Sequence, residues 1–364
     1  MSNTRSKAVN SADVARRAGV SQSTVAIVMR GQAKQRKISS ATTRRVFEAA
    51  SELAYVPNGI ARNLRLRRSN SIGVVLIDLR LEWARGILQG MNSVFDETEH
   101  TAFISVHENV PWRARKELRA CVERRDEGII CQPDPGGAEI YADIKRAGLP
   151  MVLLGDRPED VRDISFVAWD SGPAARLAAE HLIATGRRRI GIISVDYPMQ
   201  MNRARGEAAL AVLGAAGMPR SGHGFFTVPV APSGGDVLFE ALSGMFAPGC
   251  EHPDALFALN DALALSTLEV LHVLGIRVPD DVALMGMGDL PFTAYAGVSL
   301  STMKEPIEEM GREAAKLMLE LIAHPGKGPV ERLIPCLELK ARRTTTPYHP
   351  RKPGGANAEI LGQD

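Results

Sequence analysis

The stretches Ser71-Ile72-Gly73-Val74-Val75 and Arg189-Ile190-Gly191-Ile192-Ile193 open two segments of similar texture. Each stretch starts a series of short runs rich in β-branched residues, separated by Ala-, Leu- and Arg-rich segments of helical length. Alternating strands and helices predict a parallel sheet with right-handed crossovers. Because the series occurs twice, we expect two similar α/β lobes, each with a parallel Rossmann-like sheet, and a cleft between them.

The same alternation predicts the individual elements of the two lobes. The expected strands cover residues 72–77, 102–106, 128–131, 151–154, 190–195, 225–228, 255–258 and 282–285. The expected helices cover residues 85–98, 114–124, 137–147, 172–185, 203–216, 234–246, 261–274 and 306–322. In open α/β sheets, ligands bind beyond the carboxyl ends of the strands, so two facing lobes would close on one small molecule.

Polar and aromatic side chains near the expected strand ends are the candidates for holding that molecule. The candidate effector-binding residues are Arg80, Trp83, Asp170, Arg203, Asn260 and Asp289. Four of them have structural alternatives. Trp83 could be ordinary core, Asp170 could cap a helix, and Arg203 could form an ion pair across the cleft. One of Asn260 and Asp261 is expected to cap the helix that follows. Arg80 and Arg203 together would favour an acidic or phosphorylated sugar.

The charge of the chain is divided unevenly along its length. Residues 1–68 contain 14 Lys and Arg but only three Asp and Glu, a net charge of +11, whereas the whole chain carries +2 and residues 69–364 therefore carry −9. A basic first fifth indicates a module that meets a polyanion. The alternative, a disordered basic tail, is disfavoured because residues 11–56 are apolar at helical spacing and carry helix caps.

Three short helices are expected in this basic module. Ser11 is the predicted N-cap of the first helix, and Gly19 ends it. Ser21 caps the second helix only two residues later, a tight connection typical of a helix-turn-helix. The third helix starts at Ser39. A small helical bundle with a solvated basic face is the alternative for this segment alone.

The second helix of a helix-turn-helix enters the major groove and presents its N-terminal residues to the bases. Gln22 is suited to adenine, Ser23 can donate or accept, and Arg44 is suited to phosphate. The residues expected to contact DNA from this module are Ser21, Gln22, Ser23, Thr24, Ile27, Arg30 and Arg44. A short basic helix at 59–65 follows; it is too short to be stable alone in water, and an apolar residue such as Leu64 suits a minor-groove wedge.

Residues 9–66 resemble the headpiece of the lactose repressor family (LacI/GalR type). The matching stretches are Val9–Ala15, Ala18–Ser21, Thr24-Val25 and Tyr55–Asn58, with Ala61 and Leu64 behind them. The resemblance continues through Asp156-Arg157, Ala175–Ala178, Glu180–Leu182, Arg203–Gly206, Asn260-Asp261 and Leu300–Thr302, and so spans about 9–345.

The resemblance implies a sequence-specific, DNA-binding transcriptional regulator with a periplasmic-binding-protein-like sensor whose chain crosses between the lobes three times. It also implies that Leu64 inserts at the operator centre with Arg65 beside it, and that Asn58 and Ala61 belong to the same DNA-contacting hinge. Two departures concern specificity. Ala26-Ile27 stand where the family usually has Ser-Arg, and Gly288 stands where many members have the first of two aspartates.

The expected domains are a headpiece at 1–57, a hinge helix and linker at 58–69, an effector-binding and dimerisation domain at 70–345, and a disordered tail at 346–364. The first lobe is expected at about 70–185 and 298–327, and the second at about 186–297 and 328–345. The expected partners are pseudo-palindromic double-stranded operator DNA, a sugar, sugar-acid or sugar-phosphate effector, and a second copy of the chain.

Several functions are excluded on sequence grounds. The chain has no GxGxxG, GxxxxGK[ST], HExxH or GxSxG motif and no clustered histidines, so we expect neither an enzyme nor a bound metal or cofactor. The four cysteines are scattered, and the chain lacks an apolar run of membrane-spanning length. A cytoplasmic protein with no membrane partner is expected.

Overall fold

The computed structural model describes residues 9–29, 31–55, 69–80, 82–134, 138–196, 200–218, 225–229, 234–247, 249 and 251–346. The chain divides into two compact units, with the boundary after Asn70. Each unit is described by itself.

The first unit is a three-helix headpiece, made of α1 (Ser11–Ala18), α2 (Gln22–Met29) and α3 (Ser40–Glu52). Its core is a small cluster of Val and Ala side chains that includes Val14, Val25 and Val46. Gly19 ends α1 in the left-handed conformation, with φ 65°, as predicted. Ser21 Oγ accepts a hydrogen bond from the backbone N–H of Thr24 at 3.1 Å, and this bond makes Ser21 the cap of α2.

The predicted cap of the first helix was wrong by one residue. Asn10, not Ser11, is the N-cap: its Oδ1 accepts from the backbone N–H of Ala12 at 2.8 Å. Asp13 completes a capping box, because its Oδ2 accepts from the backbone N–H of Asn10 at 3.1 Å. An Asn cap with an acidic residue three positions later satisfies N–H groups at both ends of the first turn, so the acidic residue selects the position before Ser11.

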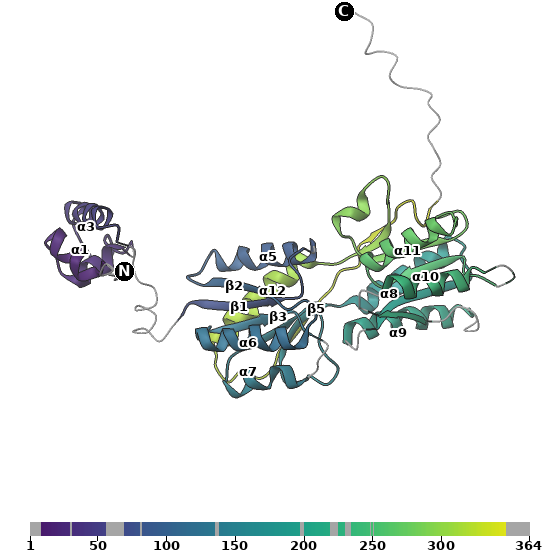
Figure 1. Cartoon of the computed structure of the whole chain (residues 1–364), viewed down its shortest axis with the longest axis horizontal. Coiled ribbons are helices and arrows are strands. Elements are labelled where there is room, and N and C mark those ends of the chain that lie inside the picture. Colours follow the sequence, from purple (N-terminus) through teal and green to yellow (C-terminus); the bar gives the residue numbers. More distant parts are fainter. Residues whose placement is uncertain are drawn as a thin grey trace, which may run out of the picture. The chain divides into compact units, whose positions relative to one another are not determined.

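The second unit contains two six-stranded sheets (Figure 1). The strand order of the first is β11-β5-β4-β3-β1-β2, and that of the second is β12-β10-β9-β8-β6-β7. All neighbouring strands are parallel except β12, which runs antiparallel to β10. The first sheet consists of β1 (Ser71–Leu76), β2 (Thr101–Val106), β3 (Gly128–Cys131), β4 (Met151–Leu154), β5 (Ser165–Trp169) and β11 (Glu331–Ile334). The second consists of β6 (Ile190–Asp196), β7 (Phe225–Pro229), β8 (Ala255–Ala258), β9 (Ala283–Gly288), β10 (Ser301–Lys304) and β12 (Leu339–Lys340).

Helices cover both faces of each sheet. The first sheet packs against α5 (Glu82–Phe95) and α12 (Ile307–Ala323) on one face, and against α6 (Pro111–Arg124), η1 (Ala138–Tyr141) and α7 (Ala142–Arg146) on the other. The second sheet packs against α8 (Ser171–Ala184) and α9 (Gln200–Ala215), and against α10 (Gly234–Met245) and α11 (Asp261–Val273). A short turn of 3-10 helix, η2 (Pro291–Ala294), follows β9. Central strands such as β1 and β5 are buried along their whole length, as expected of a doubly covered parallel sheet.

All eight predicted strands are present, but four short strands were missed and the lobe limits need correction. The chain leaves the first sheet directly after β5, so α8 packs on the second sheet and not in the predicted first lobe. Likewise β10 pairs with β9 in the second sheet, and β11 pairs with β5 in the first. The chain therefore crosses between the sheets three times, after β5, β10 and β11, as the resemblance implied. None of the described helices is long and apolar enough to cross a membrane.

Candidate DNA interface and effector site

The headpiece presents its polar residues on the surface. Gln22 and Ser23 are exposed, and Thr24 and Ile27 are partly exposed. Arg44 is exposed on α3 and makes no ion pair with any described residue. A side chain in this state is available for a phosphate.

Two further arginines of the headpiece are exposed but already paired. Arg16 Nη1 lies 3.4 Å from Asp13 Oδ1, and Arg17 Nη2 lies 2.6 Å from Glu52 Oε2. Exposed ion pairs contribute little, so phosphates could replace these carboxylates at small cost. The remaining predicted DNA contacts, Arg30, Asn58, Ala61, Leu64 and Arg65, lie outside the described residues.

A second polar site forms where the carboxyl ends of strands from both sheets meet. Asp156, just after β4, accepts hydrogen bonds from the backbone N–H groups of Met201 at 2.8 Å and Asn202 at 3.2 Å, in the first turn of α9. Burial raises the pKa of Asp156, and these backbone donors oppose the rise. The carboxylate therefore ties the first lobe to the start of a second-lobe helix.

Arg205 of α9 reaches the same region. Its Nε donates to Ser171 Oγ at 3.0 Å, and its Nη1 donates to the carbonyl oxygen of Leu259 at 3.3 Å. The guanidinium lies 5.4 Å from the ring centroid of Trp169, the last residue of β5. Because Arg205 touches residues that follow β5 and β8, it spans the strand ends of both sheets.

Glu305 follows β10, at the second crossing between the lobes. It lies close enough to Arg205 for the positive charge of Arg205 to stabilise its carboxylate. Its Oε1 accepts a hydrogen bond from Trp83 Nε1 at 3.0 Å. Burial raises the pKa of Glu305, while Arg205 and the Trp83 hydrogen bond act to lower it. The Trp83 ring packs close to Gly155, where a Cβ would lie 3.0 Å from Cζ2. We call Trp83, Asp156, Arg205 and Glu305 the interlobe cluster.

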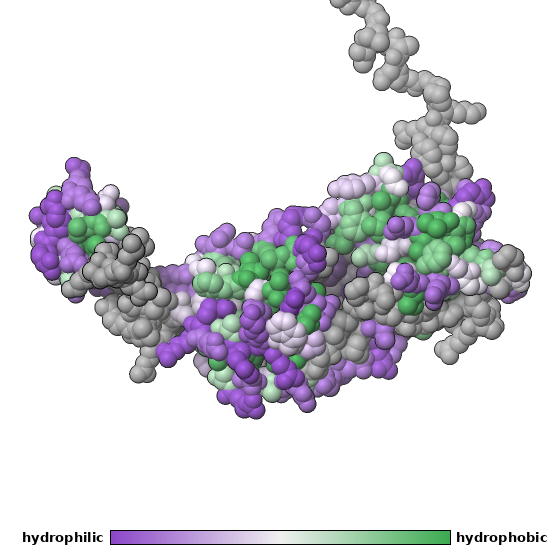
Figure 2. All heavy atoms as spheres, in the orientation of Figure 1, coloured by the Kyte–Doolittle hydropathy of each residue, from purple (hydrophilic) through white to green (hydrophobic). Residues whose placement is uncertain are grey.

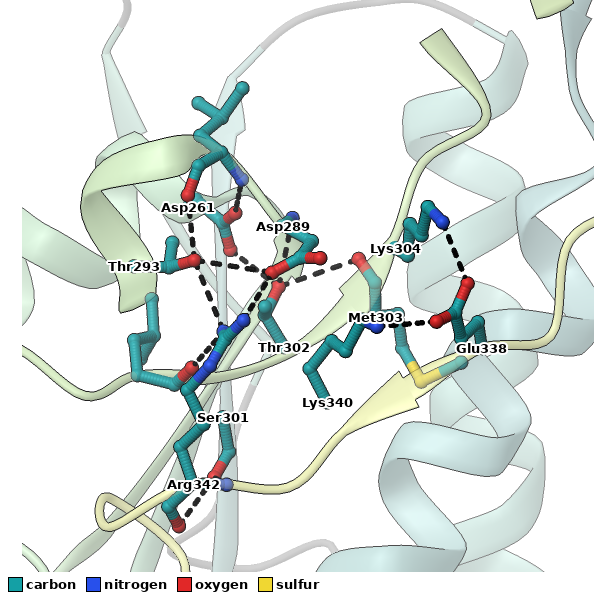
Figure 3. Close-up of polar contacts among 12 residues, drawn as sticks. Asp261, Asp289, Thr293, Ser301, Thr302, Met303, Lys304, Glu338, Lys340 and Arg342 are labelled. Atoms are coloured by element: carbon teal, nitrogen blue, oxygen red, sulfur yellow. Dashed lines mark hydrogen bonds and ion pairs between the residues drawn. The ribbon is translucent and has the colours of Figure 1, made fainter. Parts of the chain in front are cut away.

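A separate network lies beside this cluster at the ends of β9 and β10 (Figure 3). Asp261 Oδ1 accepts from Thr302 Oγ1 at 2.6 Å, and its Oδ2 accepts from the backbone N–H of Leu290 at 2.9 Å. Asp289 Oδ1 accepts from Arg342 Nη2 at 2.6 Å. Asp261 is buried without a cationic partner among the described residues, and desolvation raises its pKa to about 6.

Asp261→Asn is expected to change the pH dependence of stability. A carboxyl with a raised folded pKa contributes stability below its ordinary pKa near 3.8, and that contribution is lost as pH rises toward 6. An amide can still accept from Leu290 and donate to Thr302, so the variant should gain about 2 kcal/mol relative to wild type between pH 4 and pH 7. Urea unfolding at a series of pH values measures the difference.

Asp281→Asn is the control, because Arg277 lowers the pKa of Asp281 to about 2. Its stabilising effect is present above the ordinary pKa and fades as pH falls, so the pH-dependent difference has the opposite sign. Parallel stability curves for wild type and Asp261→Asn would contradict the raised pKa.

Comparisons with known proteins agree with both units. Residues 12–58 match the model of bacterial regulatory proteins of the lacI family, and residues 179–345 match the model of a periplasmic binding protein-like domain. The HTH-type transcriptional repressor PurR of Aliivibrio salmonicida (strain LFI1238) is 26% identical over 311 residues, which cover 85% of this chain and 91% of the relative. The chain belongs to the lacI family of bacterial regulatory proteins. The family assignment confirms the expected fold and shows that the chain is a regulator and not an enzyme.

Solved structures resemble this lacI-family chain along nearly its whole length. A complex of the transcriptional regulator CelR with cellobiose has a TM-score of 0.66 and 27% identity, and the match covers 92% of this chain and 99% of that one. The lac repressor dimer bound to operator and an anti-inducer has a TM-score of 0.78 and 23% identity, over 93% and 99% of the two chains. The second likeness supports the fold alone.

Of the six effector-binding residues predicted for this lacI-family regulator, the structure brings only Trp83 into the interlobe cluster. Arg80 is exposed and bonded to Asp78. Arg203 is also exposed and pairs with Glu207 at 2.8 Å and with Glu159 at 3.1 Å. The pair with Glu159 joins the two lobes, and so matches the structural alternative considered for Arg203.

The other three predicted residues lie at strand ends but differ in their contacts. Asn260 caps α11, since its Oδ1 accepts from the backbone N–H of Leu263 at 2.7 Å. Asp289 is engaged by Arg342. Asp170 occupies the N-cap position of α8, yet its side chain makes no cap hydrogen bond, so it stays a candidate ligand group.

Three charged members of the interlobe cluster, Asp156, Arg205 and Glu305, were missed. A signal for Arg205 was present in the sequence. Met201, Ala209 and Leu213 are buried at intervals of four or eight residues, and Arg205 lies on that same face of α9. Arg203, two residues earlier, must point the other way.

Proposed function

We propose that this regulator is a homodimeric repressor of carbohydrate or sugar-acid catabolic genes, controlled by a small molecule bound at the interlobe cluster. The observation that carries the proposal is the meeting of Arg205, Asp156 and Glu305 at strand ends of both sheets. A ligand that bonds to groups from both lobes necessarily favours one lobe arrangement over another.

The chemistry of the cluster favours a polyhydroxylated ligand. Glu305 and Asp156 offer acceptors for hydroxyl groups, Arg205 offers donors, and Trp83 offers an apolar ring. The cellobiose complex of CelR is a sugar complex of a similar protein. Neutral sugars are favoured over acidic or phosphorylated sugars. Arg80 and Arg203, the two arginines expected to bind an acidic group, are both exposed and paired with carboxylates.

Exposed apolar side chains support a dimer. Phe103 and Ile104 on the edge strand β2 are 49% and 45% exposed. Phe239 of α10 and Val273 of α11 are 42% and 66% exposed, and Figure 2 shows hydrophobic residues gathered over these two helices. Exposed apolar side chains gathered over neighbouring helices, as over α10 and α11, are typical of protein interfaces.

Two measurements on the full chain test the proposal. Binding to pseudo-palindromic duplexes should fall by about two to three orders of magnitude over a modest rise in salt, since several phosphates are contacted. Tryptophan fluorescence should then report saturable binding of a neutral sugar, and that sugar should change the affinity for the duplex. Sugar binding without any effect on DNA affinity would overturn the regulatory coupling.

Leu64→Ala is expected to separate the two activities. In a dimer the substitution removes both proposed minor-groove wedges, so operator affinity should fall roughly tenfold or more. Sugar affinity should be unchanged, because residue 64 precedes the sensor unit. Electrophoretic mobility shifts and fluorescence titrations of the same preparation measure both. Equal losses in the two assays would mean that the headpiece segment and the sensor do not have separate roles.

A further inference from the structure

Helix α2 of the headpiece has an unusual surface for a DNA-reading element. It runs over Gln22–Met29 and contains no charged residue. Val25 and Val28 are buried, and Met29 packs against the same headpiece core. The helical period of 3.6 residues therefore places Ser23, Ala26 and Ile27 on the opposite, outward face.

The side chains on or beside this outward face differ in what they have left to offer. Ser21 is committed to the helix cap, and Ser23 Oγ lies 2.8 Å from its hydroxyl. Gln22 is exposed, and its amide makes no hydrogen bond with any residue the structure describes. Ile27 is partly exposed and, within the described headpiece, does not join the residues that pack on the core. The start of α2 thus presents the amide of Gln22, and its outward face presents the aliphatic side chain of Ile27.

Among the described residues of the headpiece, positive charge lies outside α2. Arg44 and Arg45 are exposed on α3, and residues 34–37 (Lys-Gln-Arg-Lys) form an exposed basic loop. Such groups bind phosphates and fix register without distinguishing bases. The commonest specific contact to the O6 and N7 atoms of a guanine is an Arg or Lys at the base edge, and α2 supplies neither.

We propose that α2 reads A·T pairs: Gln22 bonds to an adenine through N6 and N7, and Ile27 contacts the 5-methyl group of a thymine. Both pairings follow from the atoms that the bases expose in the major groove. The inference rests on the proposed function, because it requires α2 to enter that groove. To the proposed function it adds a prediction about the DNA sequence: each operator half-site has A·T pairs where the first two turns of α2 contact the bases.

The test begins with selection of binding sites from a random duplex pool by the full-length protein. Each thymine of the selected half-site is then replaced by deoxyuridine, which lacks only the methyl group. One position should lose affinity about fourfold, the value expected for one buried methyl contact. Ile27→Ala should abolish that loss while leaving the salt dependence of binding unchanged, and Ile27→Val should be intermediate. Ile27→Arg should shift selection toward guanine at that position.

Arg44→Ala is the matched control. It should weaken all duplexes alike and reduce the salt slope by about one, while the deoxyuridine effect persists. Selected half-sites with G·C pairs at the α2 positions, or a deoxyuridine effect that survives Ile27→Ala, would overturn the inference and leave the repressor proposal intact. Failure to enrich any sequence over the pool would overturn both. Circular dichroism of each variant checks that the headpiece is folded.

Discussion

Arg205→Ala is expected to weaken sugar binding about a hundredfold, whereas Arg203→Ala changes it little. The Arg205 guanidinium is anchored through Nε and Nη1 to Ser171 and Leu259, while Nη2 makes no hydrogen bond with a described residue. A ligand hydroxyl at this group would gain a charge-assisted hydrogen bond, and loss of one or two such bonds corresponds to about two orders of magnitude in affinity. Calorimetric titration with the best neutral sugar measures the change.

Arg205→Lys sharpens the result, because it retains the charge but loses the planar fork. An affinity between those of wild type and Arg205→Ala would indicate that geometry and charge both contribute. DNA affinity without sugar should be the same for all these variants. If Arg203→Ala costs as much as Arg205→Ala, the ligand binds at the surface near Glu159 and the interlobe cluster is not the effector site.

The difference between these two arginines illustrates what the sequence could predict. The strand-end rule located the site, because the carboxyl ends of β4, β5, β8 and β10 do converge on it. Sequence motifs drew attention to residues 203–206 as a group, but a motif does not state which side chain faces the sheets. That direction is set by the buried face of α9, and it changes completely within two residues.

The missed strands have an equally physical cause. Ser165–Trp169 is buried on both faces, so it lacks the alternation that marks a half-exposed strand. In Ser301–Lys304 the first three residues are buried and Lys304 is exposed, but the two hydroxyl residues make the run look like a loop. The Thr302 hydroxyl donates to Asp261, which is distant in sequence. Without these strands the crossings could not be placed, and the lobe limits were displaced as a consequence.

Glu305 was not predicted as a site residue, because the strand that places it was not predicted either. It follows β10 directly, and its partner Trp83 is 222 positions away in the chain. Trp83 itself was predicted as a ligand group, yet its indole N–H is already bonded, which leaves its ring face as the part available to a sugar. The sequence thus identified residue types suited to a sugar, while the contacts that orient them come from tertiary structure.

Arg157→Ala should destabilise the sensor more than any surface substitution, by about 3 kcal/mol. The Arg157 side chain is only 1% exposed. Its Nη1 donates to Glu331 Oε1 at 2.5 Å, its Nε and Nη2 donate to Gln200 Oε1 at 3.0 and 2.7 Å, and it lies over the ring of Phe166. Alanine would remove several hydrogen bonds and leave a cavity, and both losses lower the free energy of unfolding. Urea unfolding of the full chain, followed by tryptophan fluorescence, measures the effect.

Two variants divide the contribution of Arg157 into packing and polar contacts. Arg157→Met fills most of the space without the hydrogen bonds, whereas Glu331→Gln alters a partner that is 51% exposed and should cost little. Because Gln200 belongs to α9 and Glu331 to the first sheet, loss of the polar contacts also loosens the tie between the lobes. An intermediate stability for Arg157→Met, with altered sugar affinity, is therefore expected. If Arg157→Met is as stable as wild type, the polar contacts of Arg157 contribute no net stability. The cost of burying its charge would then equal the free energy gained from its hydrogen bonds. In that case Arg157 would act only by positioning the two lobes.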